Sequence, residues 1–207
     1  NIMQKIFVTG ISTGVGKTIA SAIFTEALQA DYWKPIQAGD LDNSDTDRVK
    51  SLISNSKTKF HPCSYELTSP MSPHAAAEID GIRIDRFHIN EPETENNLII
   101  EGSGGILVPL NEEDTLFDII MPDYKVVVVS RNYLGSINHS LLTINWLQYK
   151  GYEVSVLFSG ESNPQTENII LLKTGVSSLG RIDEEEKFDK EVIKKYADKF
   201  EGILRSL

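Results

Sequence analysis

One glycine-rich run constrains this chain more than any other feature. It reads Gly10-Ile11-Ser12-Thr13-Gly14-Val15-Gly16-Lys17-Thr18, follows the apolar stretch Ile6-Phe7-Val8 and opens a helix-compatible segment. In a turn between a strand and a helix, backbone N–H groups can point at a phosphate, a lysine adds charge at the outer phosphates, and a threonine hydroxyl can ligate Mg²⁺. The usual spacing of such a loop puts its first glycine at position 11, where this chain has Ile11, so the loop is a lengthened variant. The run predicts a site for a nucleoside triphosphate.

Apolar runs typical of strands alternate with helix-like segments along the chain. The consecutive valines 126–129 indicate a strand buried on both faces, as in a parallel sheet covered by helices. The alternation predicts an α/β fold with a doubly wound, mainly parallel sheet flanked by helices, and residues 1–207 are expected to form one domain. Strands are expected at 5–9, 32–35, 97–101, 125–130 and 154–158, and helices at 17–30, 137–149, 166–173 and 189–207. The proline-rich stretch 61–95 is expected to hold a short helix in a loop that is either a lid or a long connection.

Composition and charge exclude several classes of partner. The formal net charge is −10, which argues against nucleic acid or an anionic membrane surface, since both require a basic surface. The single cysteine, Cys63, excludes an internal disulfide framework and a cysteine metal cluster. No apolar run has the length of a membrane span and no signal-peptide pattern is present, so we expect a cytoplasmic protein.

Three more motifs follow expected strands, at the edge of a parallel sheet where ligands bind. Lys34 begins Lys34-Pro35-Ile36-Gln37-Ala38-Gly39, and could neutralise a transferring phosphoryl group or an anionic substrate, although a surface lysine before a turn would look the same. Glu101 begins Glu101-Gly102-Ser103-Gly104-Gly105 and occupies a position typical of a Mg²⁺ ligand. Leu134-Gly135-Ser136-Ile137-Asn138-His139 opens a helix whose free N–H groups could hold a carboxylate or phosphate, whereas His139 by itself is more often structural than catalytic.

An acidic cluster follows the Lys34 motif. A nucleotide-bound Mg²⁺ usually needs only one or two carboxylates, and residue types alone do not choose among the cluster's members. Acidic residues near a helix N-terminus also interact favourably with the helix dipole, so a structural role is equally compatible with any one of them. The cluster consists of Asp40, Asp42, Asp45 and Asp47.

Taken in order, these segments resemble the dethiobiotin synthetase family, and the resemblance covers nearly the whole chain. The family's phosphate loop, Gly-Thr-Asp-Thr-x-Val-Gly-Lys-Thr, has the same extra residue as the loop described above. Each motif alone is weak or moderate support, but six in the same order are highly specific. The family's motifs are matched by Gly10–Thr18, Lys34–Gly39, Asn43–Asp45, Pro70–His74, Glu101–Gly105 and Leu134–His139.

The resemblance implies a P-loop NTPase fold and a ligase reaction of biotin biosynthesis. Diaminopelargonic acid (7,8-diaminononanoate) reacts with CO₂ to give a carbamate, ATP phosphorylates the carbamate, and the second amine closes the ring of dethiobiotin with release of phosphate. Lys17 and Lys34 would be catalytic, with Lys34 acting as a charge and not as a base, and Thr18, Asp45 and Glu101 would hold Mg²⁺. A homodimer is implied, because in this family the Ser136 helix end serves the neighbouring subunit. The resemblance assigns ATP to Gly14, Val15, Gly16, Lys17, Thr18, Ile19, Asp45, Glu101, Gly102, Ser103 and Gly104, and the substrate to Thr13, Lys34, Ala38, Ser136, Ile137 and Asn138.

Three positions depart from the family pattern. Gly160 stands where the family usually has an asparagine that reads adenine, and Asp183 replaces the proline of a later Gly-x-Ile-Pro segment. Nucleobase selectivity is therefore open: backbone groups could hold the base, or discrimination could be loose. Ala38 replaces a small polar residue, so one hydroxyl contact to the substrate is expected to be missing.

Two other functions are compatible with a phosphate loop of this kind. A nucleotide-switch ATPase of the partitioning or scaffold-loading type would turn over ATP without the diamine, but such proteins carry an extra lysine near the start of the loop, where this chain has Gly10-Ile11-Ser12. A small-molecule kinase would release a stable phosphorylated product without ring closure.

Overall fold

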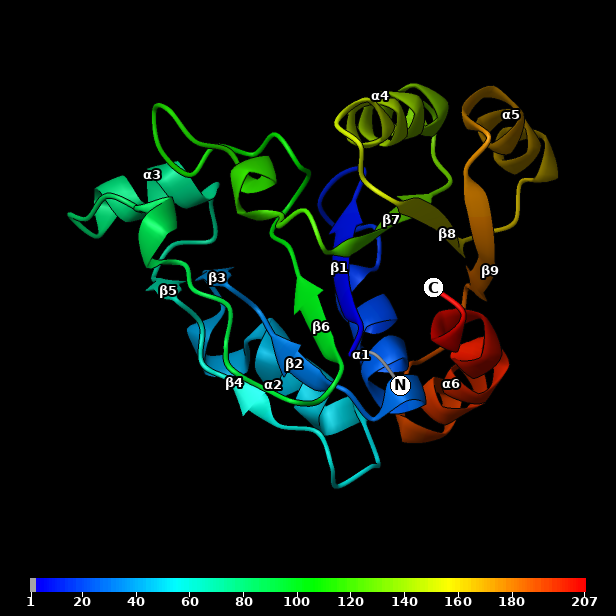
Figure 1. Cartoon of the computed structure of the whole chain (residues 1–207), viewed down its shortest axis with the longest axis horizontal. Coiled ribbons are helices and arrows are strands. Elements are labelled where there is room, and N and C mark those ends of the chain that lie inside the picture. Colours follow the sequence, from blue (N-terminus) through cyan, green and yellow to red (C-terminus); the bar gives the residue numbers. More distant parts are fainter. Residues whose placement is uncertain (1–2) are drawn as a thin grey trace.

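The fold is built on a seven-stranded sheet with strand order β4-β2-β6-β1-β7-β8-β9. A computed structural model describes residues 3–207, and every pair of neighbouring strands in this sheet is parallel (Figure 1). The phosphate-loop strand β1 lies near the centre, between β6 and β7. The strands are β1 (Lys5–Gly10), β2 (Asp31–Trp33), β4 (Phe60–His61), β6 (Leu98–Glu101), β7 (Lys125–Arg131), β8 (Val154–Gly160) and β9 (Ser177–Asp183).

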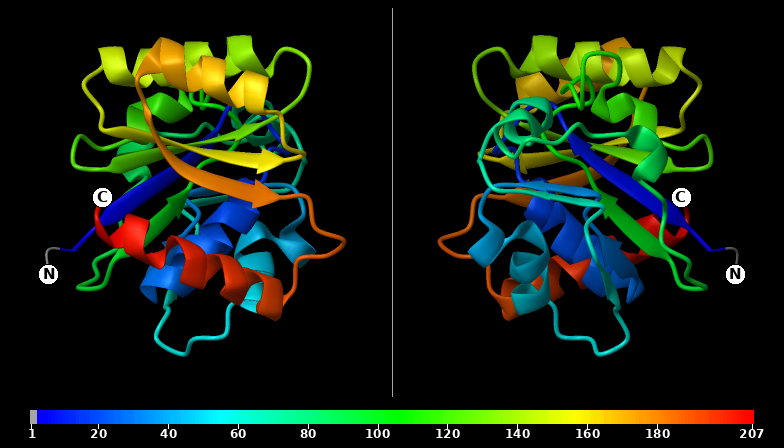
Figure 2. Two further views of the ribbon diagram at one scale, coloured as in Figure 1. Left: turned by 90° about the vertical axis from the view of Figure 1, so that its right-hand side faces the viewer. Right: turned by 90° about the vertical axis from the view of Figure 1, so that its left-hand side faces the viewer.

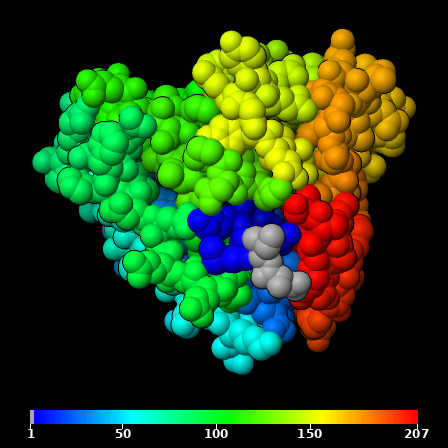
Figure 3. Space-filling model, viewed as in Figure 1, coloured from blue at the N-terminus to red at the C-terminus, as the bar shows by residue number. Residues whose placement is uncertain are grey.

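Helices cover both faces of this sheet, as a doubly wound fold requires. In Figure 2 the sheet lies between one layer that contains α1, α2 and α6 and an opposite layer that contains α4 and α5. Figure 3 shows the C-terminal helix beside the first strand, and the side-chain amide of Gln4, just before that strand, donates to the Arg205 carbonyl at 3.5 Å. The helices are α1 (Lys17–Leu28), α2 (Asp45–Leu52), α3 (Pro73–Ile79), α4 (Ser136–Tyr149), α5 (Pro164–Thr174) and α6 (Lys190–Arg205).

The core explains why these residues form these elements. Val126 to Val129 of β7 are at most 1% exposed, so this strand is buried on both faces as its sequence predicts. Fully burying each such side chain stabilises the fold by about 1.5–3 kcal/mol. Helix α6 is amphipathic, and its buried stripe packs against α1. That stripe consists of Ile193, Tyr196, Ala197, Phe200 and Leu204.

All the strands and helices expected from the sequence are present, with ends that differ by a few residues. The short helix expected within 61–95 is α3. The strands and α-helices that were not expected are the edge strands β9 and β4, helix α2, and a separate parallel pair of β3 (Ile36–Ala38) with β5 (Tyr65–Leu67). None of the helices in residues 3–207 combines the length and the apolarity needed to cross a bilayer.

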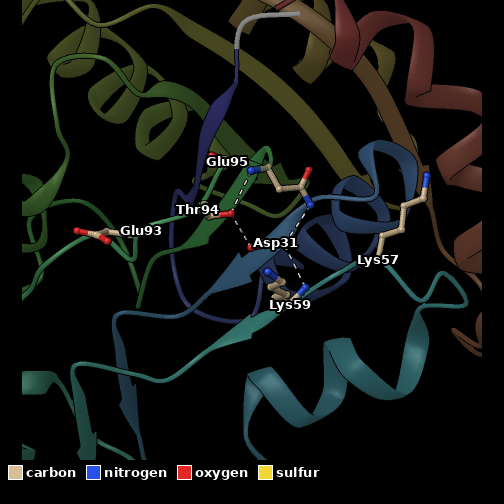
Figure 4. A pocket seen from close by; sticks show the side chains of 7 residues that line it. Asp31, Lys57, Lys59, Glu93, Thr94 and Glu95 are labelled. Atoms are coloured by element: carbon tan, nitrogen blue, oxygen red, sulfur yellow. Dashed lines mark hydrogen bonds between the residues drawn. The ribbon is translucent and has the colours of Figure 1, made fainter.

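A hollow of about 640 Å³ lies at the amino ends of β2 and β6, away from the phosphate loop (Figure 4). Its central group is the buried Asp31 carboxylate, which accepts hydrogen bonds from the Lys59 backbone, Thr94 Oγ1 and Asn96 Nδ2 at 2.8–3.1 Å and also contacts His61 Nε2 at 2.8 Å. With both oxygens occupied by protein groups, Asp31 joins β2 to β4 and to the segment before β6. The arrangement is a structural clamp.

Candidate functional site

A cleft of about 830 Å³ lies at the carboxyl ends of β1, β2 and β6. This is the edge of a parallel sheet where ligands bind, and three of the four predicted motifs meet there. The cleft is lined by Thr13, Gly14, Gly16, Lys17, Thr18, Ile19, Lys34, Gln37, Ala38, Asp40, Asp45, Arg48, Pro70, Met71, Ser72, Pro73, Glu101, Ser103, Gly104, Val108, Arg131 and Phe188.

The phosphate loop begins at Gly10 because no side chain fits there. A Cβ on Gly10 would lie 2.5 Å from Val15 Cγ2, so the loop folds back tightly over its own start. Gly16 caps α1 with a φ of 103°, a left-handed conformation that favours glycine. The N-terminal N–H groups of α1 therefore face the cleft without intrahelical partners. The loop is tied to β8 by Ser159 Oγ, which donates to the Val15 carbonyl at 2.6 Å.

Lys17 is the first residue of α1. Its ammonium donates to the Ser12 carbonyl at 3.0 Å, across the loop. Burial, together with the positive charge of Lys34, lowers the pKa of Lys17 to about 8, against the opposing effects of Glu101 and Asp45. The negative charge of a bound polyphosphate would oppose both causes, because it favours the protonated form of Lys17.

Opposite the loop, a buried carboxylate is held from three sides. Thr18 Oγ1 donates to Glu101 Oε1 at 2.7 Å, and Lys34 Nζ lies 3.5 Å from the same oxygen. Tyr32 Oη donates to the other oxygen, Oε2, at 2.6 Å. Burial and the Glu101 charge raise the pKa of Tyr32 well above its usual value, so the hydroxyl keeps its proton.

Lys34 is a fixed positive charge between two carboxylates. Its ammonium is 2.6 Å from Asp45 Oδ2 and donates to the Gly102 carbonyl at 3.1 Å. Burial alone would lower the pKa of Lys34, but the charges of Glu101 and Asp45 outweigh it and leave the pKa raised. A lysine with a raised pKa does not give up its proton at neutral pH, which supports the expectation that it acts as a charge.

The structure distinguishes the members of the acidic cluster. Asp45 is the one that pairs with Lys34, and Lys34 lowers its pKa against the opposing effect of burial. Gln37 Oε1 accepts a hydrogen bond from the Asp45 backbone at 3.1 Å and fixes the start of α2. Asp47 instead forms the capping box of α2 with Ser44, and Asp42 lies in the short helical turn Leu41–Asn43.

The far wall of the cleft comes from the motif at residues 70–74. Gly39 has a φ of 75°, and a Cβ there would lie 2.6 Å from Pro70, so the two segments are in direct contact. Ser103 Oγ donates to the Ile36 carbonyl at 2.7 Å, which joins the glycine-rich turn after β6 to β3. Part of the 61–95 stretch therefore forms one side of the site.

The fourth motif lies elsewhere. Ser136, Ile137 and Asn138 form the first turn of α4 and do not line the cleft. The Ser136 hydroxyl is buried and has no hydrogen-bond partner in the part of the chain that the structure describes. Leu134 just before it is 105% exposed and Ile137 is 36% exposed. A substrate-binding role for this turn stays a prediction.

A smaller hollow of about 60 Å³ adjoins the loop at the ends of β8 and β9. Gly160 and Asp183, two of the three departures from the family pattern, both line it together with Phe188. The Arg131 side chain lies over Gly160, where a Cβ would be 3.1 Å from the guanidinium carbon, and Arg131 is paired with Glu184 at 3.0 Å. The Gly160 carbonyl accepts a hydrogen bond from Arg181.

The cleft has the donors that Mg²⁺ prefers. Thr18 Oγ1, Asp45 Oδ2 and Glu101 Oε1 are all hard oxygen atoms, and each is held close to Lys34 or to the start of α1. Residues 3–207 contain no group of three or more His, Cys, Asp or Glu side chains arranged to hold a metal. The donor set fits a cation that takes its remaining ligands from water and nucleotide phosphates.

Sequence reasoning did not select two side chains that organise this cleft. Gln37 lies within the Lys34 motif, and its place between that lysine and the glycine turn was a usable signal. Tyr32 lies in a short apolar strand and had no signal, because its contact with Glu101 depends on which strands are neighbours.

Comparisons with known proteins show what this chain is similar to. A family model described as "AAA domain" matches residues 4–192. The chain is 53% identical to the ATP-dependent dethiobiotin synthetase BioD of Christiangramia forsetii, over 97% of this chain and 98% of that protein. It is 48% identical to the protein of the same name from Cytophaga hutchinsonii, over 95% of this chain and 97% of that protein.

Solved structures show the same fold at low identity. A plasmid partition protein from Borrelia burgdorferi has a TM-score of 0.63 at 16% identity and covers 100% of both chains. A MinC:MinD cell division protein complex from Aquifex aeolicus has a TM-score of 0.60 at 14% identity, over 99% of this chain and 96% of that one. At these identities the likeness concerns the fold alone, whereas the full-length sequence relatives identify the group. The chain belongs to the ATP-dependent dethiobiotin synthetase family.

Proposed function

We propose that this protein closes the ring of dethiobiotin from diaminopelargonic acid, CO₂ and ATP, as a Mg²⁺-dependent ligase of biotin biosynthesis. The observation that carries the proposal is Lys34, a buried charge between Asp45 and Glu101 that faces Lys17 and Thr18 across one cleft. Such a cluster suits a reaction in which an anion forms and is phosphorylated, and phosphate is then expelled. The match to dethiobiotin synthetases over nearly the whole chain supports this reaction.

The chemistry proceeds in three steps. One amine of the substrate attacks CO₂ and loses a proton, giving a carbamate. A carbamate oxygen attacks the γ-phosphorus of ATP, ADP leaves, and a carbamic–phosphoric anhydride results. The second amine attacks the anhydride's carbonyl carbon and loses a proton, the C–O bond to phosphate breaks, and the cyclic urea of dethiobiotin forms with release of inorganic phosphate.

The residues would act mainly by positioning and by charge, as is usual in phosphoryl transfer. Backbone amides of Gly14 to Thr18 would cradle the phosphates, and Lys17 would offset charge on the γ-phosphoryl oxygens. Lys34 would stabilise the carbamate and then the transferring phosphoryl group. Thr18, Asp45 and Glu101 would hold Mg²⁺, which when bound neutralises phosphate charge. Ile19 and the Gly102–Gly104 turn would complete the nucleotide site.

The substrate would lie along Thr13, Lys34 and Ala38, with its carboxylate tail at the first turn of α4 of a second subunit. The exposed apolar side chains of Leu134 and Ile137 beside this turn support a homodimer whose sites lie at the interface. Use of ATP as co-substrate supports a place in the cytoplasm.

The test is a mass-spectrometric assay with diaminopelargonic acid, ATP, Mg²⁺ and ¹³C-bicarbonate. We expect dethiobiotin one mass unit heavier than in unlabelled bicarbonate, together with equal amounts of ADP and phosphate. A folded protein that binds ATP but forms no dethiobiotin would overturn the proposal. A stable phosphorylated product without ring closure would indicate a kinase instead.

The fold resemblance to partition proteins does not favour a nucleotide switch. That resemblance is at 12–16% identity for the structures with TM-scores of 0.53–0.63, and the loop lacks the extra lysine typical of that class. ATP turnover that is equally fast without the diamine would point to the switch.

A further inference from the structure

Tyr32 has a buried hydroxyl to which the proposed chemistry gives no role. Its side chain is fully buried, and it stands two residues before Lys34. Residues two apart in extended chain lie on the same face, and both side chains reach Glu101 at the end of the neighbouring strand β6. The Tyr32 ring packs against Phe60 of β4, with ring centroids 5.9 Å apart, which fixes the hydroxyl in place.

The two oxygens of Glu101 have different partners. Oε2 accepts the Tyr32 hydroxyl at 2.6 Å, whereas Oε1 accepts the Thr18 hydroxyl at 2.7 Å on the side of the cleft. Tyr32 itself does not line the cleft, so it cannot touch a bound nucleotide directly. Any influence of Tyr32 on the site must pass through the Glu101 carboxylate.

That influence has a simple physical basis. The terminal torsion of a glutamate is broad, so a carboxylate held at one oxygen only can rotate. A donor on Oε2 fixes the plane of the carboxylate and leaves Oε1 as the oxygen that faces Thr18. Hydrogen bonds from behind a metal-binding carboxylate orient it and tune its affinity.

We propose that Tyr32 is a positioning residue that holds Glu101 Oε2 and so commits Oε1 to the divalent cation carried by the nucleotide. This rests on the proposed assignment of Glu101 to the Mg²⁺ site. The competing interpretation is that Glu101 merely satisfies a hydroxyl that the packing against Phe60 has buried, in which case Tyr32 affects stability alone.

Isothermal titration of the full chain with a non-hydrolysable ATP analogue distinguishes a positioning role of Tyr32 from a role in stability alone. Each variant is titrated once with Mg²⁺ and once with EDTA, and the ratio of the two affinities is the gain due to the metal. For Tyr32→Phe we expect this gain to fall about tenfold, in the range seen when groups behind a metal ligand are removed, while the affinity in EDTA is unchanged. In activity assays, the Mg²⁺ concentration for half-maximal rate should rise in parallel.

Tyr124→Phe is the matched control. Tyr124 is also buried, and its hydroxyl donates to a glutamate, Glu91 Oε2, at 2.7 Å, but it lies just before β7, outside the cleft. Both variants should lower the melting temperature, and only Tyr32→Phe should reduce the gain due to Mg²⁺. A gain in Tyr32→Phe equal to that of the wild type would overturn the proposal.

A measurement on the wild type covers the case in which Tyr32→Phe does not fold. In a crystal structure with Mg²⁺ and the analogue, Glu101 Oε1 should face the cation while Oε2 keeps its hydrogen bond to Tyr32. A cation on Oε2, or a released Tyr32 hydroxyl, would overturn the proposal. The assay for dethiobiotin is independent: a wild type that forms no dethiobiotin but shows the expected Mg²⁺ effect would overturn only the proposed function.

Discussion

At the scale of single residues, the cleft depends on a few side chains whose partners are fixed by burial. Lys34 is 4% exposed and lies between two carboxylates, so its charge faces the cleft without the screening that water gives to a surface lysine. Gly10, in contrast, is important for the side chain that it lacks, because any side chain there would collide with Val15. Each leads to a test.

Removing the Lys34 ammonium should stop the reaction. For Lys34→Ala we expect kcat for dethiobiotin formation to fall at least about 100-fold, the loss typical when a charge-stabilising donor is removed. The measurement is product formation at saturating substrates, with Lys57→Ala, at the distant hollow beside Asp31, as the control. A near-normal rate in Lys34→Ala would show that its assigned role is wrong.

Adding one methyl group at Gly10 should distort the phosphate loop. Gly10→Ala puts a Cβ 2.5 Å from Val15 Cγ2, and we expect a loss of about 1–3 kcal/mol in the free energy of unfolding, typical of overpacking, with weaker ATP binding. Gly202→Ala in α6 is the matched control, because nothing lies within 4 Å of its Cβ. In a helix that change should stabilise by about 0.5–1 kcal/mol. Urea unfolding and ATP titration of both variants provide the comparison, and Gly10→Ala should behave as wild type only if the loop relaxes freely.

At the scale of elements, the sequence predicted the interior better than the edges. The strand at 125–130 is apolar throughout because both its faces are buried, and such strands are recognisable from sequence. Strand β9 is half exposed and contains Gly180 and Arg181, so it lacks a continuous apolar run, and β3 and β5 are three residues each. The site shows the same difference. The phosphate loop can be recognised from consecutive residues in the sequence. The pairing of Tyr32 with Glu101 cannot, because it depends on the crossover that makes β2 and β6 neighbours in the sheet.

Asp31 makes the packing of β2, β4 and the segment before β6 sensitive to acid. Burial alone would raise its pKa, but hydrogen bonds from His61, the Lys59 backbone, Thr94 and Asn96 outweigh it and leave the pKa lowered. A carboxyl group whose pKa is lower in the folded state binds a proton more readily when unfolded. Its contribution to stability is therefore present above its ordinary pKa of 3.8 and is lost as the pH falls through the lowered value.

The Asp31→Asn variant tests this clamp. At neutral pH we expect a loss of about 1–3 kcal/mol in the free energy of unfolding, since buried partners lose a charged acceptor. The difference from wild type should be constant from pH 6 to about 4 and should shrink as the pH falls below 3.8, because the unfolded wild type then binds a proton more readily than the folded protein does. Urea unfolding at several pH values measures it, with Glu95→Gln, an exposed carboxylate at the same hollow, as the control. A difference that is constant with pH would contradict the role assigned to the charge.

At the scale of the whole molecule, the proposed site is divided. The cleft has the phosphate loop, the lysines and the carboxylates, while the first turn of α4, expected to hold the substrate's carboxylate, does not line it. If that turn serves a neighbouring subunit, the two halves of a site can be inactivated separately in different chains.

Mixing two defective variants should then restore activity. Lys34→Ala removes the charge of one half, and Asn138→Asp places a negative charge where the substrate's carboxylate would bind. In an equal mixture half of the dimers are hybrids, each with one intact site, so about a quarter of wild-type activity should return at low diamine concentration. A mixture no more active than its parts would show that each site is built within one chain.

The hydrogen bond from Ser159 to the Val15 carbonyl has a consequence for engineering. Ser159 fixes the phosphate loop, and the next residue, Gly160, borders the small hollow beside Arg131 and Phe188. The family pattern predicts the nucleobase at this hollow, so the two adjacent positions would have separable roles, one for the phosphates common to all nucleotides and the other for the base that varies. A library meant to change the preferred nucleotide should vary Gly160 and Arg131 while Ser159 is left untouched.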